Sequence, residues 1–455
     1  AALGLKAVFP VLGDSNVLQA AISIGSPDGN ELALCCRFVD YMCKQAMSSS
    51  RLVERKSYIF GTRRMVLNRT NLWRVAALFA FLSGCTTMDT KPSPIGVQSS
   101  PTGCETVRHT AVLGRAGPAY KKLAALQQRL PEWLEQSTVP SSGVSYVSDG
   151  TLQWTLTCGE RSEGTPAATD TLYNTASIAK PIVGEIVLRL ASRGEISLDE
   201  PMAAYWTDPD IADDPRRMRL TPRSALAHQT GFKNWRRRSD GVLAFVTDPG
   251  SERGYSGEGI RYIVRFLERK LDKPFDEIAQ ETLFDPLGIK DASFVTRPEL
   301  KPQYAWGRLA DGEWIDPGTF DEPLGAGRLR ISSVDYAKIL AAIMRNQGVD
   351  AERSAERSRI ALDERADRCG PDGRPVEACP ARMGFSTGWY IHEFEEGAVF
   401  THTGANRPEQ SFAYFKPGEE TGAVVFANGQ ESKSLIGKIA RLIEDDERVA
   451  IMEGY

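Results

Sequence analysis

The sequence is poor in the residues that build metal centres. It has only four histidines and eight cysteines among 455 residues, and the cysteines show neither a C-x-x-C pair nor another metal-ligand spacing. Histidine and cysteine are the usual protein ligands of zinc. A zinc site is therefore not expected, and the sequence indicates no other metal and no cofactor.

Long apolar runs and a dominant charge are also missing. No apolar stretch approaches the roughly 18 residues that a membrane-spanning helix requires. The chain has 55 Lys and Arg residues against 59 Asp and Glu residues, so its formal net charge of -4 gives no general affinity for nucleic acid. With 42% hydrophobic residues, the composition is that of a soluble globular protein with one large or two modest cores.

Residues 65–85 have the layout of a bacterial export signal. Met65 is a possible start, two arginines follow it, and the short apolar run 75–82 comes next. In such signals the positive charges stay behind while a short apolar helix enters the export channel. The sequence L-S-G-C that ends the segment resembles a lipoprotein signal, which implies that Cys85 carries the lipid. The alternative is an ordinary buried helix, but eight apolar residues are short for one.

This signal predicts the organisation of the N-terminal part. Residues 1–64 would be an upstream or disordered extension, residues 65–84 the signal peptide, and residues 85–111, rich in Thr, Ser and Pro, a flexible tether. The protein would then be anchored by lipid in the bacterial cell envelope, on the periplasmic face. Thr86, directly after the lipid-bearing cysteine, favours the outer membrane.

The cysteines beyond the export signal predict disulfides. Four remain, and an even number in an exported chain is compatible with two bridges. Cys369 and Cys379 flank the turn-forming sequence G-P-D-G, which favours that pair and leaves Cys104 with Cys158.

Hydrophobic periodicity predicts strands near both ends of residues 112–455. Leucines recur at helical spacing from Leu123 to Leu134, with Pro131 expected to bend or divide that helix. Two alternating segments joined through Asp149-Gly150 form a hairpin signal. Three further strands are expected at 398–401, 411–415 and 423–427, before a last helix.

The middle of the chain reads as mostly helical. Helices are expected at 178–190, stopped by Gly194, at 256–271 and at 332–347. The highly charged segment 351–368 is interpreted as a solvated helical insertion. Strands from both ends around a helical middle indicate an α+β fold.

Ser177-Ile178-Ala179-Lys180 is the only S-x-x-K sequence in the chain. It opens a strongly apolar helix, where an i,i+3 offset places the Lys180 amine on the same face as the Ser177 oxygen. A serine hydroxyl is a weak nucleophile until a neighbour takes its proton, and a lysine whose pKa is lowered by burial can do this. The alternative is a helix cap beside a surface lysine, but a lysine among these isoleucines would be costly to bury without function.

Two later segments supply partners for this motif. Tyr255 lies in the glycine-rich turn GYSGEGI, and the sequence His402-Thr403-Gly404 ends a strand. In this order the three motifs resemble the β-lactamase-related serine hydrolases, the superfamily of class C β-lactamases, D-alanyl-D-alanine carboxypeptidases, D-aminopeptidases and family VIII esterases. The stretches LASRGEISLDEP, SALAHQTGF and DPLGIKDASF strengthen the resemblance, which spans about residues 115 to 445.

The resemblance implies a β-lactamase/penicillin-binding-protein-like fold in residues 112–455. An antiparallel sheet flanked by helices would form one lobe, from 112–170 with 380–455. Residues 171–379 would form a helical lobe, and the site would lie in the cleft between the lobes.

The resemblance also implies a role for each site residue. Ser177 would be the acylated nucleophile, Lys180 its proton partner and Tyr255 the general base. Backbone N–H groups of Ser177 and Ala405 would form the oxyanion hole. The substrate edge would be lined by His402, Thr403 and Gly404.

Two departures from the family pattern bear on the substrate. The tyrosine motif is Tyr255-Ser256-Gly257 where class C β-lactamases have Tyr-x-Asn, and the K-T-G lysine is His402, which is mostly neutral at pH 7. Strong β-lactamase activity is therefore not expected. Trp235, in a basic cluster after HQTGF, is a candidate substrate-binding residue if that cluster forms a cleft rim, although a solvated basic loop is the simpler interpretation.

Three functions are consistent with these features. The first is a serine hydrolase that cleaves a small-molecule or peptide ester or amide through an acyl-enzyme at Ser177. The second is a D-alanyl-D-alanine carboxypeptidase or D-aminopeptidase. The third is a non-catalytic module that binds penicillin or wall fragments. The oligomeric state is left open by the sequence.

Overall fold

The structure, a computed structural model, describes residues 57–60, 63–66, 97–99, 103–110, 117–370, 379–444 and 446–450. The chain divides into two compact units, Ala1–Ser93 and Pro94–Tyr455. In the first unit the described residues form an antiparallel hairpin of β1 (Ser57–Phe60) and β2 (Arg63–Val66). Cys85, nearly all of the predicted signal peptide and most of residues 1–64 lie outside the described residues.

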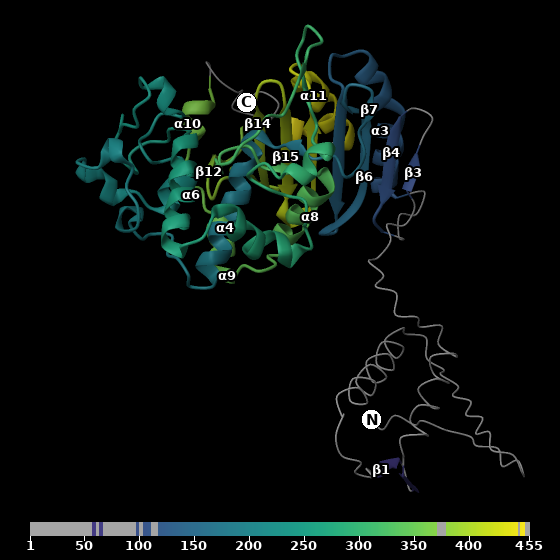
Figure 1. The fold of residues 1–455 in the computed structure, drawn as a ribbon, viewed down its shortest axis with the longest axis horizontal. Coiled ribbons are helices and arrows are strands. Elements are labelled where there is room, and N and C mark those ends of the chain that lie inside the picture. The colour runs from purple at the N-terminus through teal and green to yellow at the C-terminus, as the bar shows by residue number, and fades with distance from the viewer. Residues whose placement is uncertain are drawn as a thin grey trace, which may run out of the picture. The chain divides into compact units, whose positions relative to one another are not determined.

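The second unit is built on one large antiparallel sheet (Figure 1). Its strands follow the order β12-β13-β14-β15-β16-β5-β6-β4-β3, with β7 paired to β6. Their bounds are β3 (Val97–Ser99), β4 (Cys104–Arg108), β5 (Ser141–Ser148), β6 (Thr151–Ser162), β7 (Thr165–Pro166), β12 (Arg382–Phe385), β13 (Tyr390–Phe394), β14 (Gly397–Ala405), β15 (Gln410–Lys416) and β16 (Thr421–Ala427). Because β5 pairs with β16, strands from both ends of the domain meet in one sheet, as the α+β prediction required.

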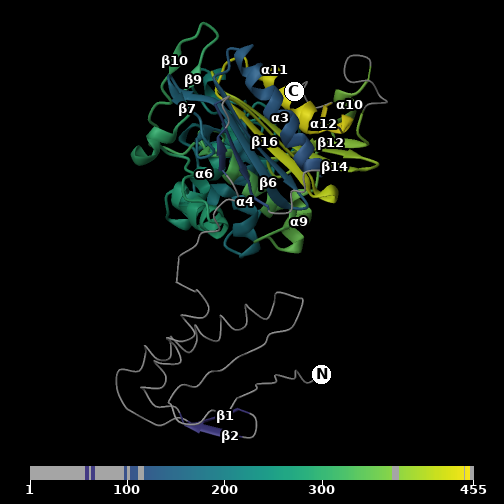
Figure 2. The same cartoon turned by 90° about the vertical axis from the view of Figure 1, so that its right-hand side faces the viewer.

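Two helices cover one face of the sheet. Helices α3 (Pro118–Glu135) and α11 (Ser432–Ile443) lie side by side across it in Figure 2. The leucines predicted to share one face of α3 are all buried against sheet residues. Pro131 was predicted to bend or divide this helix, and the structure shows that it does not divide it. Burial of four leucines outweighs the loss of one hydrogen bond.

The other face of the sheet is covered by α8 (Ser333–Met344), which packs on β5, β6 and β16. The sequence prediction had assigned α8 to the helical lobe. The correction follows from its composition, because α8 is apolar almost all round and needs a partner on each side. Helix α4 (Ala179–Ser192) shares a hydrophobic core with α8 and is buried along nearly its whole length.

The remaining helices gather beyond α4, on the left of Figure 1. They include α5 (Pro222–Leu226), α6 (Gly257–Leu271), α7 (Phe275–Ala279), α9 (Ala351–Arg357) and α10 (Arg365–Arg368). The short α12 (Glu447–Ala450) follows α11. Serine side chains cap α6 and α8 as their sequences suggest: Ser256 accepts from the Gly259 N–H, and Ser332 from the Asp335 N–H.

The predicted tether of residues 85–111 is too long. Residues Cys104–Arg108 form β4, which pairs with β6 from Cys104 opposite Cys158 to Arg108 opposite Trp154. The Cys104–Cys158 disulfide fastens this strand to the sheet, and Val107 is buried. A five-residue strand gives too short an alternation to stand out beside Thr, Ser and Pro. The second favoured disulfide, Cys369–Cys379, is also formed.

The segment 351–368 is largely exposed and partly helical, as predicted, but two of its charged side chains are buried. Arg357 makes a bidentate ion pair with Glu185 of α4, at 2.6 and 3.0 Å, and both side chains are buried. Glu364 is buried as well and pairs with Arg253 at 2.8 Å. Composition cannot distinguish charges that face water from charges that pair inside, and here the pairs join the segment to the helical core.

No helix among the described residues has both the length and the apolar character needed to span a bilayer.

Candidate active site

Ser177 lies at the turn that leads into α4. It is partly exposed, while its neighbours Ala176 and Ile178 are fully buried. Ala176 has a left-handed backbone with φ 48°, an unusual conformation for alanine, and its N–H donates to Asn174 Oδ1 at 3.0 Å. The strained turn therefore presents the Ser177 hydroxyl to solvent at the start of a buried helix.

Lys180 lies one helical turn after Ser177, as the S-x-x-K spacing predicts. Its amine is buried and donates to Ser177 Oγ at 2.8 Å and to the Ala326 carbonyl at 2.8 Å. No carboxylate among the described residues forms an ion pair with it. Burial lowers the pKa of Lys180 to about 7, so a large fraction of the amine is neutral at neutral pH and able to accept a proton.

Tyr255 completes the group around Ser177. Its hydroxyl is hydrogen-bonded to the Ser177 side chain, and Lys180 Nζ lies 4.9 Å from its ring centre. Burial raises the pKa of Tyr255 above its usual value of 10, an effect that the hydrogen bond to Ser177 partly opposes. Tyr255 is therefore a phenol rather than a tyrosinate at neutral pH in the free protein.

Sequence reasoning missed the role of His228, although it lies in the HQTGF stretch that supported the resemblance. Its carbonyl accepts from the Gly254 N–H at 2.8 Å, and its Nδ1 accepts from the Ser256 N–H at 3.1 Å. Its ring centre lies 4.3 Å from that of Tyr255. His228 thus holds the chain on both sides of Tyr255, and it does so with a left-handed backbone at φ 59°.

His402 is buried beside this group, and its role at the substrate edge stays a prediction. Its Nδ1 contacts the Thr403 carbonyl at 2.7 Å, which assigns the proton to Nδ1. Burial, and secondly the charge on Lys180, lower the pKa of His402 to about 3. The ring is therefore neutral at pH 7, as predicted. Alternation along β14 turns the neighbouring Thr403 side chain outward.

Gly404 brings β14 against the nucleophile. A side chain there would meet Ser411 Oγ, the Thr175 carbonyl at 2.5 Å and the Ser177 nitrogen at 3.0 Å. The Ser411 hydroxyl also donates to the Thr175 carbonyl at 2.6 Å, which ties β15 to the same turn. This close approach brings the backbone that carries Ala405 next to Ser177, the arrangement that the predicted oxyanion hole requires.

Trp235 has a structural explanation. Its ring covers Gly257 at the start of α6, where even a methyl group would lie 2.5 Å from the indole. The following Arg236 pairs with Asp208 at 2.7 Å and Glu258 at 3.0 Å. The basic cluster is thus partly neutralised within the fold, and packing rather than substrate accounts for Trp235.

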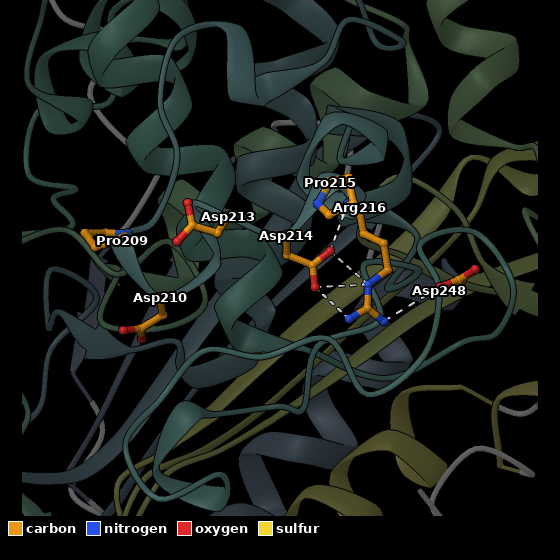
Figure 3. Close-up of a pocket in the computed structure, with 7 residues that line it drawn as sticks. All are labelled: Pro209, Asp210, Asp213, Asp214, Pro215, Arg216 and Asp248. Atoms are coloured by element: carbon orange, nitrogen blue, oxygen red, sulfur yellow. Dashed lines mark hydrogen bonds and ion pairs between the residues drawn. The ribbon is translucent and has the colours of Figure 1, made fainter.

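A separate hollow of about 750 Å³ shares no residue with the Ser177 group. Figure 3 shows the residues that line it. Its lining residues are Pro209, Asp210, Asp213, Asp214, Pro215, Arg216 and Asp248. Arg216 contacts both Asp214 and Asp248. Within the described residues, no group of three or more His, Cys, Asp or Glu side chains is arranged to hold a metal ion.

Comparison with known proteins agrees with this geometry. The Beta-lactamase family profile matches residues 124–446. Penicillin-binding protein 4 of Amycolatopsis lactamdurans is 24% identical over 350 residues, which cover 69% of this chain and 87% of that protein. Esterase EstB of Burkholderia gladioli is 26% identical over 256 residues, which cover 44% of this chain and 64% of the esterase.

Solved structures show the same fold. A class C beta-lactamase superposes with a TM-score of 0.58 at 14% identity, over 72% of this chain and 97% of that one. The octameric penicillin-binding protein homologue from Pyrococcus abyssi gives a TM-score of 0.57 at 18% identity, over 70% of this chain and 77% of that one.

The fold and the family match together define a serine hydrolase with the β-lactamase/penicillin-binding-protein architecture. The chain belongs to the beta-lactamase family.

Proposed function

We propose that Ser177 is the nucleophile of an ester or amide hydrolase and that Lys180 is its base. The observation that carries this proposal is the 2.8 Å contact between Lys180 Nζ and Ser177 Oγ at a buried amine without a carboxylate partner. A lysine held neutral in this way can accept the hydroxyl proton at neutral pH.

The reaction proceeds in two steps. Lys180 takes the Ser177 proton as Oγ bonds to the substrate carbonyl carbon, and the N–H groups of Ser177 and Ala405 stabilise the oxyanion. Tyr255, as a phenol beside Oγ, passes a proton from the Lys180 ammonium to the leaving group as the scissile bond breaks. Water then attacks the acyl-enzyme with proton transfer to the same pair, which releases the acid and restores Ser177.

The substrate is proposed to be an ester first and a D-alanyl peptide second. The ester is favoured because the neutral His402 supplies no permanent charge for a substrate carboxylate, and an esterase is among the relatives. The second candidate is favoured by a relative of 23% identity over 150 residues, a D-alanyl-D-alanine-carboxypeptidase/endopeptidase from Escherichia coli. A purely binding module fits less well, because nucleophile, base and tyrosine are assembled.

The cellular location is proposed to be the bacterial envelope, with a lipid anchor at Cys85. Two disulfides in the described domain support an oxidising compartment. Mass spectrometry of the mature N-terminus tests the anchor: a lipid-modified cysteine is expected, and an unmodified peptide running through Cys85 would disprove it.

Acylation of Ser177 is tested by intact-mass spectrometry with a p-nitrophenyl ester and a fluorescent penicillin. The wild type and the control Ser358→Ala, which removes an exposed serine hydroxyl, are expected to form the adduct. The Ser177→Ala protein is expected to form none. An adduct that persists in Ser177→Ala would reject the nucleophile.

A further inference from the structure

Three non-glycine residues with left-handed backbone lie near the proposed site. Eight non-glycine residues of the described chain have φ near 50–60°. Five of them lie in turns or at helix ends, where such a conformation is common: Asp149, Asp240, Asp272, Asn346 and Glu420. The other three are Ala176, His228 and Arg328.

Contacts explain the first two of these strained residues but not the third. The Ala176 N–H is held by Asn174 Oδ1, and His228 holds the chain around Tyr255. Arg328, at φ 64°, has a half-buried side chain that forms no hydrogen bond and no ion pair with any described residue. A conformation that costs about 1–3 kcal/mol indicates a function when nothing in the fold explains it.

The backbone around Arg328 runs along the nucleophile turn. The Ala326 carbonyl accepts from the Lys180 amine. Gly327 lies against the Ala176 carbonyl: a Cβ atom on Gly327 would be 3.6 Å from that oxygen. The Leu329 carbonyl accepts from the Thr175 N–H at 2.9 Å. Arg328 therefore lies between residues that touch the Ser177 and Lys180 segment on either side.

The guanidinium of Arg328 is held by an aromatic ring, and no carboxylate of the described residues forms an ion pair with it. It stacks on the Phe320 ring, with its carbon 3.9 Å from the ring centre, so its N–H edges stay available. The charged groups that face it are Arg261 and Glu322. Glu322 is already shared by Arg265 at 2.7 Å and Arg261 at 3.7 Å, so positive charge is locally in excess.

We propose that Arg328 is an anion-binding residue at the edge of the active site and that its ligand is a carboxylate of the substrate. This proposal rests on the proposed hydrolase function. The planar fork of a guanidinium suits a carboxylate. The preferred substrate is then an ester or amide that carries a free carboxylate away from the scissile bond.

The test compares two esters that differ in one charge. The p-nitrophenyl monoester of glutaric acid has the anionic group, and p-nitrophenyl pentanoate has the same acyl length without it. Arg328→Gln is expected to lower kcat/KM for the anionic ester about tenfold or more and to change the neutral ester less than about twofold. Arg328→Lys keeps the charge but loses the planar fork of the guanidinium. Its kcat/KM for the anionic ester should lie between those of the wild type and Arg328→Gln.

Controls separate the charge effect from the others. Arg269→Gln removes the same charge from an exposed arginine and is expected to leave the ratio of the two kcat/KM values unchanged. An unchanged ratio in Arg328→Gln, or an equal change in Arg269→Gln, overturns the anion-binding role. Ser177→Ala is measured in parallel: turnover that survives there rejects the proposed function, whereas its loss together with an unchanged Arg328→Gln ratio rejects only the role of Arg328.

Discussion

Replacing His228 should disable the site by releasing Tyr255. In His228→Leu the Ser256 N–H loses its buried acceptor, which costs about 1–3 kcal/mol of the free energy of unfolding. The left-handed backbone adds little to this cost, because the histidine that leucine replaces already bears most of it. We therefore expect a free energy of unfolding about 1–3 kcal/mol lower. We also expect kcat to be at least about tenfold lower, because a displaced Tyr255 that raises the activation barrier by about 1.4 kcal/mol slows the reaction tenfold.

His228→Asn is the matched control. The asparagine Oδ1 can accept from the Ser256 N–H in place of the histidine Nδ1, and asparagine tolerates φ 59°. Only the ring contact with Tyr255 is lost, worth about 0.5–1.5 kcal/mol. This variant should keep most of its stability and activity.

Urea denaturation and p-nitrophenyl ester turnover measure the two effects separately. A double mutant with Tyr255→Phe provides the decisive comparison, because removal of the tyrosine hydroxyl should leave little further activity for His228→Leu to remove. The reasoning is refuted if His228→Leu, while folded, keeps kcat within about twofold of the wild type, or if the two substitutions act additively on the rate.

Four further predictions concern Lys180, Gly404 and the second disulfide. Because Lys180 acts as a neutral amine with a pKa of about 7, acylation measured by stopped flow should rise with pH through about 7 and then level off; a flat profile would contradict this. The same lowered pKa means that the unfolded chain binds more protons than the folded one between about pH 7 and 10.5. The free energy of unfolding should therefore fall as the pH falls through that window. This pH dependence should be weaker in Lys180→Met, which has no amine to titrate. Gly404→Ala should reduce kcat by about 10²-fold with little change in secondary structure by circular dichroism, because the added methyl meets the Ser177 nitrogen; wild-type kcat would show that this approach is not required. Replacing Cys369 and Cys379 by serine opens a loop with a sequence separation of 10 and should lower the free energy of unfolding by about 3 kcal/mol. Turnover should also fall, because Cys369 and Tyr255 pack on the same hydrophobic cluster. An unchanged thermal melt would disprove the contribution of this disulfide.

The central features of this domain could be predicted from local patterns. The S-x-x-K spacing places two polar groups one helical turn apart whatever the tertiary structure, and the structure shows Lys180 and Ser177 in contact. The hairpin of β5 and β6 was equally legible, because Asp149 and Gly150 both take the left-handed backbone that its tight turn requires.

The missed features depend on contacts between distant parts of the chain. Arg357 and Glu185 are each unremarkable in the sequence, and only the fold makes them a buried pair. His228 lies 28 residues before Ser256, and no periodicity reports that its ring accepts a backbone N–H there. Likewise, the left-handed backbone at Arg328 cannot be predicted from the presence of an arginine in the sequence.

The tie between Ser411 and the Thr175 carbonyl, which are separated by 236 residues, has a consequence for biosynthesis. A ribosome releases the segment that carries Ser177 long before it releases β14 and β15. Until those strands are made, a nascent chain lacks the Ser411 hydroxyl that holds the Thr175 carbonyl. The arrangement around Ser177 can therefore form only late in the synthesis of the domain.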